Sequence, residues 1–196
     1  MDHDGYSNQN RQFGQHSMTD EQIMIEVKSG DLTKASILFD RYHKHLYNFF
    51  VKISFDRDLG NDLTQNVFLR MIKFRHTYRA DSNFKSWIFK IARNVNADHY
   101  RNNKIAASKN ESVDDLCQDI VDQQETTRQI EQDRILYRAM EKLSIEDRAL
   151  LQLSKFQKMK YEHIAEIHGT SVGAIKVKVH RAIQKLKDHY FKLEKI

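Results

Sequence analysis

Proline is absent from this chain, and cysteine occurs once, at Cys117. One cysteine cannot build an intrachain disulfide, and without a second cysteine nearby it makes a poor zinc site. We interpret Cys117 as incidental, with a redox-sensing role as the alternative.

Long apolar runs are also missing. No stretch approaches the roughly 18 apolar residues that a membrane-spanning helix needs, and residues 1–17 are polar where a signal peptide would be apolar. We therefore expect a cytoplasmic protein that does not insert into a membrane.

Alternating apolar and polar residues, the pattern of a half-buried strand, do not occur over any length that would suggest a sheet. Helical periodicity runs through most of the chain. The predicted fold class is all-α, with two small helical domains joined by a flexible acidic linker, of which the C-terminal one is a helix-turn-helix.

Charge is spread unevenly and suggests where the domains divide. The chain has a net charge of +5 and a pI of about 9.2, while residues 108–127 are acidic. Few large apolar side chains occur in 108–127, so it cannot offset the entropy of ordering and is predicted to be a linker. Residues 1–17 resemble it and are expected to form a disordered tail. The expected domains are thus 18–107 and 128–196.

The excess of basic over acidic residues favours a polyanionic partner, although it also fits binding to a membrane surface or a role in solubility alone.

Helix signals in the first domain begin with Thr19 and Gln22, whose spacing is that of a capping box, and the first helix is expected to end near Gly30. Three further amphipathic helices are predicted, from Leu32 through Ile53, from about Leu59 to Phe74, and from Phe84 through Val95. This domain is predicted to be a compact helical bundle.

The second domain contains the spacing of a helix-turn-helix. Ala165 allows two helices to approach, Gly169 takes the turn, and Ser171 caps the second helix, whose Ile175 points inward. Ser144 is expected to cap an earlier helix.

A helical wheel divides the last helix into a core face and a basic face. Val177, His180 and Arg181 lie opposite the apolar face, with lysines in rows on both sides. Such a face suits a recognition helix in the major groove, with cations on phosphates and the strip between them on base edges. The solvated surface of an ordinary helix is the alternative.

Three segments in order carry a family resemblance. "DLTQNVFLRM" (62–71), "FKSWIFKIARNVNADHYR" (84–101) and "YEHIAEIHGTSVGAIKVKVHRAIQKL" (161–186) resemble conserved stretches of the extracytoplasmic-function sigma factors of bacterial RNA polymerase. The resemblance covers most of residues 19–193. It implies a protein that binds core polymerase and directs promoter-specific initiation, and that is not an enzyme and needs no cofactor or metal.

The resemblance also implies partners and their contact residues. The first domain would dock on the clamp helices of the largest polymerase subunit and recognise the minus-ten element, while the second would recognise the minus-thirty-five element and hold the flap of the second-largest subunit. An anti-sigma factor is a further expected partner. Core polymerase would contact Asp62, Leu63, Gln65, Asn66 and Leu69; the minus-ten element Lys85, Lys90, Arg93, Asn94, Asn96 and Arg101; and the minus-thirty-five element Ser171, Lys176, Val177, Lys178, His180 and Arg181.

Two residues of the segment 84–101 are candidates for contact with DNA bases. Asn94 would lie at a short loop, where an amide can pair with a base edge, and Trp87 could stack on unpaired bases, although its spacing favours the core. Asn66 stands where the family usually has Glu, and Val177 where Ser is common, so the promoter sequence itself is not predicted.

Two other function classes were weighed. A helix-turn-helix regulator that acts without polymerase would need a ligand pocket or phosphoacceptor in the first domain, and no motif for either is visible. A metal-dependent nuclease would use some of the histidines, but His43 with His45 and His163 with His168 lack the i, i+4 spacing of a helical zinc site.

Overall fold

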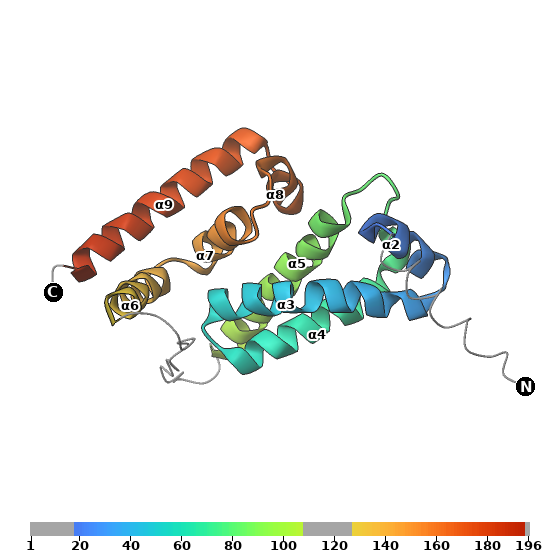
Figure 1. Cartoon of the computed structure of the whole chain (residues 1–196), viewed down its shortest axis with the longest axis horizontal. Coiled ribbons are helices and arrows are strands. Elements are labelled where there is room, and N and C mark those ends of the chain that lie inside the picture. The colour runs from blue at the N-terminus through green and yellow to red at the C-terminus, as the bar shows by residue number, and fades with distance from the viewer. Residues whose placement is uncertain (1–17, 108–126, 195–196) are drawn as a thin grey trace, which may run out of the picture.

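The computed structural model describes residues 18–107 and 127–194 (Figure 1). Within these residues the regular structure is helical throughout and contains no strand, which confirms the predicted all-α class. The predicted N-terminal tail and nearly all of the acidic linker lie outside the described residues.

The first domain is built from four α-helices and two short 3₁₀ turns. In chain order they are α2 (Asp20–Ser29), η1 (Leu32–Lys34), α3 (Ala35–Ser54), α4 (Arg57–Lys73), η2 (Arg75–Thr77) and α5 (Phe84–Ala107). The capping box predicted at Thr19 is present, and Gly30 ends α2 with a φ of 121°, a conformation that favours glycine. Helix boundaries thus follow local signals in the sequence.

Aromatic side chains fill the core of this domain. Phe49 and Phe50 on α3 are almost fully buried together with Phe84 and Phe89 on α5. The rings of Phe49 and Phe89 meet edge to face with centroids 5.5 Å apart, an arrangement that adds to the stabilisation from burial. Helix α5 is therefore fixed by its apolar side, and its other side is left for contacts outside the core.

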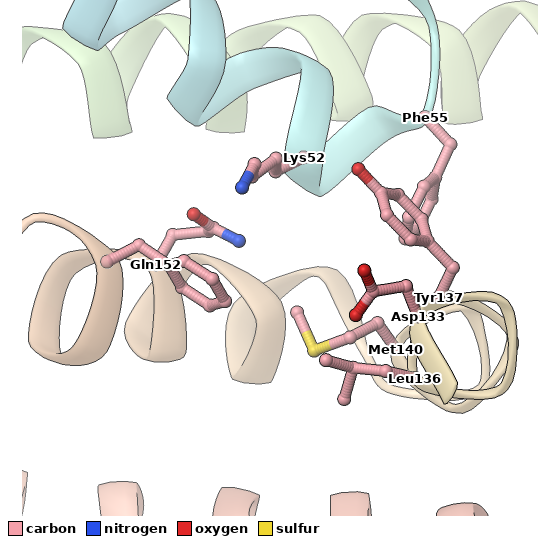
Figure 2. Close-up of a pocket in the computed structure, with 8 residues that line it drawn as sticks. Lys52, Phe55, Asp133, Leu136, Tyr137, Met140 and Gln152 are labelled. Carbon is pink, nitrogen blue, oxygen red and sulfur yellow. The ribbon is translucent and has the colours of Figure 1, made fainter. Parts of the chain in front are cut away.

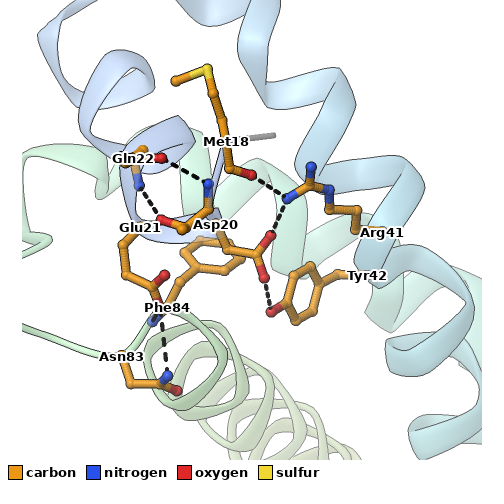
Figure 3. A network of polar contacts seen from close by, with 9 residues as sticks. Met18, Asp20, Glu21, Gln22, Arg41, Tyr42, Asn83 and Phe84 are labelled. Carbon is orange, nitrogen blue, oxygen red and sulfur yellow. Dashed lines mark hydrogen bonds and ion pairs between the residues drawn. The ribbon is translucent and has the colours of Figure 1, made fainter. Parts of the chain in front are cut away.

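A polar network fixes the start of α5 as well (Figure 3). Asp20 at the start of α2 accepts hydrogen bonds from Arg41 Nη1 at 2.6 Å and from the Tyr42 hydroxyl. The next residue, Glu21, accepts the backbone N–H of Phe84 at 3.0 Å through Oε1. A carboxylate from α2 thus satisfies one of the free donors at the N-terminus of α5.

Helices α3 and α4 approach closely at Gly60. A Cβ added to Gly60 would lie 2.5 Å from Cγ2 of Val51, a stiff β-branched side chain that is itself buried. Only glycine fits this crossing without a shift of one helix.

We expect Gly60→Ala to destabilise the protein by about 1–3 kcal/mol, because overpacking outweighs the better helix propensity of alanine. Gly173 in α9 is the matched control, since its added Cβ would have only Ser171 Oγ nearby, at 3.9 Å. Gly173→Ala should leave the midpoint of thermal unfolding unchanged or raise it. Equal midpoints for the two variants would contradict the close approach.

The second domain comprises α6 (Thr127–Glu141), α7 (Ile145–Leu151), the π-helical turn η3 (Gln152–Phe156), α8 (Tyr161–His168) and α9 (Val172–Glu194). The Ser144 side chain caps α7, as predicted. Helix α9 forms the outer edge of this domain, and α7 lies between it and the first domain (Figure 1).

The two domains pack against each other through α5 with α8 and α3 with α7. One apolar cluster runs across the seam and joins residues of both, among them Phe89 and Ile91 of α5 and Ile164 and Ile167 of α8. Between the end of α3 and α6 the seam leaves a cavity of about 200 Å³, lined by Phe55, Tyr137 and Met140 among others (Figure 2).

His168 lies at the C-terminal end of α8 close to this seam. Its Nε2 is buried and has no hydrogen-bond partner among the described residues. Burial first, and then the positive charges of Arg93 and Lys178, lower the pKa of His168 to about 4. The histidine is therefore neutral in the packed protein at neutral pH.

Acid should weaken this packing. A histidine with its pKa lowered in the folded state contributes stability that is fully present above about pH 6.5 and is lost as the pH falls toward about 4. We expect the thermal midpoint of the wild type to fall more steeply than that of His168→Gln between pH 7 and pH 5, above the range where most carboxylates titrate. Parallel profiles would show that His168 is not the group that titrates.

Candidate nucleic-acid interface

Helix α9 presents the basic face that the sequence predicts. Helix α8 ends at Gly169, whose φ of 59° makes the left-handed turn, and the Ser171 hydroxyl accepts the backbone N–H of Ala174 at 3.2 Å to cap α9. Ile175, Val179 and Ala182 of α9 are buried. Because burial fixes this side, the opposite side of the helix faces solvent.

That opposite side carries Lys176, Val177, Lys178, His180 and Arg181, all of them exposed. Val177 is 50% exposed although it is apolar. Four cationic or hydrogen-bonding side chains beside one small apolar group can contact phosphates, base edges and a thymine methyl.

Lys185, one of the lysines that flank the basic face of α9, forms an ion pair within the protein. Lys185 Nζ lies 2.7 Å from Oδ2 of Asp147, whose side chain is largely covered. The ion pair links α7 to α9.

Helix α5 carries a second polar face opposite its buried side. Lys90, Arg93, Asn94 and Arg101 are exposed on it. The loop that the resemblance implied at Asn94 is not there: α5 continues as one helix from Phe84 to Ala107, because apolar residues keep helical spacing past Asn94. Asn94 therefore projects from the middle of a helix.

Asn96, predicted to touch the minus-ten element, is buried. It follows Val95 on the core side of α5, and its Oδ1 finds no hydrogen-bond partner among the described residues. Direct contact with DNA would require α5 to turn, and contact of Asn96 with the minus-ten element stays a prediction.

Two predicted minus-ten contacts are engaged across the domain seam. Lys85 Nζ donates to the carbonyl of Gln157 at 3.1 Å, and Arg93 Nη1 donates to the carbonyl of Ile167 at 3.0 Å. Both carbonyls lie at helix C-termini, where cations are favoured. Burial lowers the pKa of Lys85.

The outward face of α4 is polar apart from one leucine. Asp62, Gln65 and Asn66 are exposed, and Leu69 is 71% exposed. An exposed leucine among polar groups is suited to a protein partner. Leu63 is only 4% exposed and belongs to the core cluster, and its contact with polymerase stays a prediction.

A series of hydrogen bonds and ion pairs joins α4 to α5. Asn66 Oδ1 accepts from Arg70 Nε at 2.9 Å, and Arg70 Nη1 pairs with Asp98 Oδ2 at 2.6 Å. Arg101 Nη2 lies 2.8 Å from the other oxygen of Asp98. Periodicity alone did not indicate this series, because it depends on how two helices cross.

Within residues 18–107 and 127–194, no group of histidine, cysteine, aspartate or glutamate side chains could hold a metal ion. None of the helices in these residues is long and apolar enough to cross a membrane.

Comparison with known proteins gives two family matches along the chain. The model for Sigma-70 region 2 matches residues 38–105, and that for Sigma-70, region 4 matches residues 133–186. The ECF RNA polymerase sigma factor SigX of Bacillus subtilis (strain 168) is 30% identical over 158 residues, which are 78% of this chain and 81% of that protein. This chain is an extracytoplasmic-function sigma factor. It directs transcription initiation by RNA polymerase.

Other similar proteins agree with this assignment. The ECF sigma factor SigM of Bacillus subtilis (strain 168) is 29% identical over 154 residues, covering 78% of this sigma factor and 93% of SigM. Among solved structures, the sigma factor RpoE in complex with the anti-sigma factor NepR from Bartonella quintana has a TM-score of 0.65 at 22% identity, covering 79% of this chain and 94% of that chain. CnrH in complex with the cytosolic domain of CnrY has a TM-score of 0.62 at 19% identity, covering 86% and 95%. Both structures share the fold of this sigma factor.

The first domain of the sigma factor is thus its region 2, and the second its region 4. Trp87, weighed as a base-stacking residue, is half-buried and packs against the region 2 core, where its ring meets Tyr78 at 5.2 Å between centroids.

Proposed function

We propose that this sigma factor uses three separate faces: α4 for core polymerase, α5 for the minus-ten element and α9 for the minus-thirty-five element. The observation that carries the proposal is the orientation of α9, whose apolar side is buried while its basic side is exposed. A cationic strip with few acids is what phosphate neutralisation requires.

For polymerase binding, α4 offers Asp62, Gln65, Asn66 and the exposed Leu69 to the clamp helices of the largest subunit. A protruding leucine bordered by hydrogen-bonding groups fits the usual pattern of an apolar anchor within a polar rim. Region 4 would hold the flap of the second-largest subunit. The sigma factor itself would act as a non-catalytic, cytoplasmic subunit.

For the minus-ten element, α5 offers Asn94 to base edges and Lys90, Arg93 and Arg101 to phosphates. Asn96 and Leu63 are left out of the proposed contacts because they are buried.

Promoter recognition on this scheme requires regions 2 and 4 to separate. In the packed protein Arg93 and Lys85 donate to carbonyls of region 4, and DNA phosphates would have to replace these acceptors. An anti-sigma factor that binds the packed form would oppose separation. The RpoE and CnrH structures hold the anti-sigma factor NepR and the cytosolic domain of CnrY, which supports a partner of this kind here.

Asp62→Ala tests the polymerase face. We expect at least a fivefold loss of affinity for core polymerase, because removing a charge that is hydrogen-bonded across an interface costs about 1 kcal/mol or more. The thermal midpoint should not change, since the side chain is exposed. Asp188→Ala on α9 removes the same charge from region 4 and should bind core polymerase normally; a loss shared by both variants would reduce the effect to net charge.

Arg181→Ala tests the recognition helix. It should cost about 1–3 kcal/mol of binding free energy at a promoter that contains a minus-thirty-five element. Lys192, also exposed, lies three turns further along α9 and serves as the control, because its removal changes the total charge equally. Affinity of the polymerase holoenzyme should be measured at fixed salt. The proposal fails if both variants lose the same affinity on promoters with and without the element.

A further inference from the structure

We infer that Asp98 is a positioning residue of the promoter-binding face: it orients Arg101 and lowers affinity for random DNA, so that promoters are favoured over other sequences. The inference rests on the proposed role of α5. None of the predicted contacts included Asp98.

Asp98 is a carboxylate on a helix face that otherwise offers cations and amides. It lies one turn after Asn94 and shares this side of α5 with Arg101. A carboxylate there would repel phosphates unless it were neutralised. Its presence on a proposed DNA-binding face therefore requires an explanation.

The explanation lies in its two guanidinium partners. Oδ2 of Asp98 is 2.6 Å from Arg70 Nη1, and Oδ1 is 2.8 Å from Arg101 Nη2. The hydrogen bond from Arg70 is the main reason that the pKa of Asp98 is lowered, and the charges of both arginines add to it. The carboxylate stays ionised, and the three groups together carry one net positive charge.

The three groups differ in exposure, and this difference assigns their roles. The side chains of Arg70 and Asp98 are 29% and 31% exposed, whereas that of Arg101 is 69% exposed. Arg70 and Asp98 thus form a half-buried ion pair between α4 and α5. Arg101 extends from this ion pair into solvent, with most of its five N–H donors still free for a phosphate.

The orientation of Arg101 and the negative charge of Asp98 both increase the preference for promoter over random DNA. A held arginine loses less side-chain entropy when it meets a phosphate at one fixed place, as it does on a correctly seated promoter. Random DNA is bound chiefly through net positive charge, which Asp98 reduces by one. The same carboxylate therefore favours the promoter and disfavours competing DNA.

Arg70 also connects Asp98 to the proposed polymerase face. Its Nε donates to Asn66 Oδ1 at 2.9 Å, so a partner that binds Asn66 would affect the position of Arg70, which in turn holds Asp98. Polymerase contact and promoter contact are joined by three consecutive hydrogen-bonded pairs.

The test compares variants of the full chain as holoenzymes with core polymerase. Asp98→Asn removes the charge and keeps the shape. Glu26→Gln is the matched control, because Glu26 is also an ion-paired carboxylate of region 2, 3.3 Å from Lys34, and lies on α2 near the other end of the domain (Figure 1). Asp98→Glu keeps the charge on a longer side chain.

Affinity is measured for a promoter and for a random duplex of equal length across a salt series. We expect Asp98→Asn to lower the ratio of promoter to random affinity about two- to tenfold, the scale of one net hydrogen bond. Its salt dependence on random DNA should steepen by up to about one unit of the logarithmic slope. Glu26→Gln should change neither quantity, and Asp98→Glu should recover part of the ratio.

An Asp98→Asn protein that behaves like Glu26→Gln would overturn the inference, as would a lower thermal midpoint with an unchanged affinity ratio, which would mark Asp98 as merely structural. Arg101→Ala distinguishes a failure of this inference from a failure of the proposed promoter contact by α5. If Arg101→Ala binds promoters normally, the proposed role of this part of α5 fails; if it weakens binding while Asp98→Asn does not, only the role of Asp98 fails.

Discussion

Burial of the apolar side of α5 is the constraint on which the rest of this sigma factor depends. Phe84, Ile88, Phe89, Ala92 and Val95 enter the region 2 core together, and each is almost fully buried. Because a helix turns 100° per residue, fixing these five fixes every other side chain of α5. The face left outside carries Asn94 and the cations, so hydrophobic packing decides which side of α5 is left for contacts outside the core.

Two cations outside the region 2 core have acceptors in region 4. Helix-end carbonyls at Gln157 and Ile167 accept from Lys85 and Arg93. A carbonyl at a helix C-terminus carries partial negative charge and resembles a weak phosphate. The packed form thus satisfies both cations, and on the proposed scheme DNA phosphates would replace the two carbonyls as acceptors.

Local features of the sequence determined several of the helix ends. Thr19, Ser144 and Ser171 cap helices where predicted, and Gly30 and Gly169 end them with positive φ. These signals act within one turn, so they can be recognised from the sequence alone. The same holds for the basic face of α9, because its core side follows from spacing alone.

The sequence by itself therefore determined the all-α fold, the helix-turn-helix and the outward cations of α9, since each depends on neighbours three or four residues apart. Only the tertiary structure decided which of the predicted contact residues are exposed. Asn96 is polar and is nevertheless buried in the region 2 core, because burial also depends on how helices pack against one another. The pairing of Asp98 with Arg70, 28 residues away, likewise required the crossing of two helices, which no local pattern encodes.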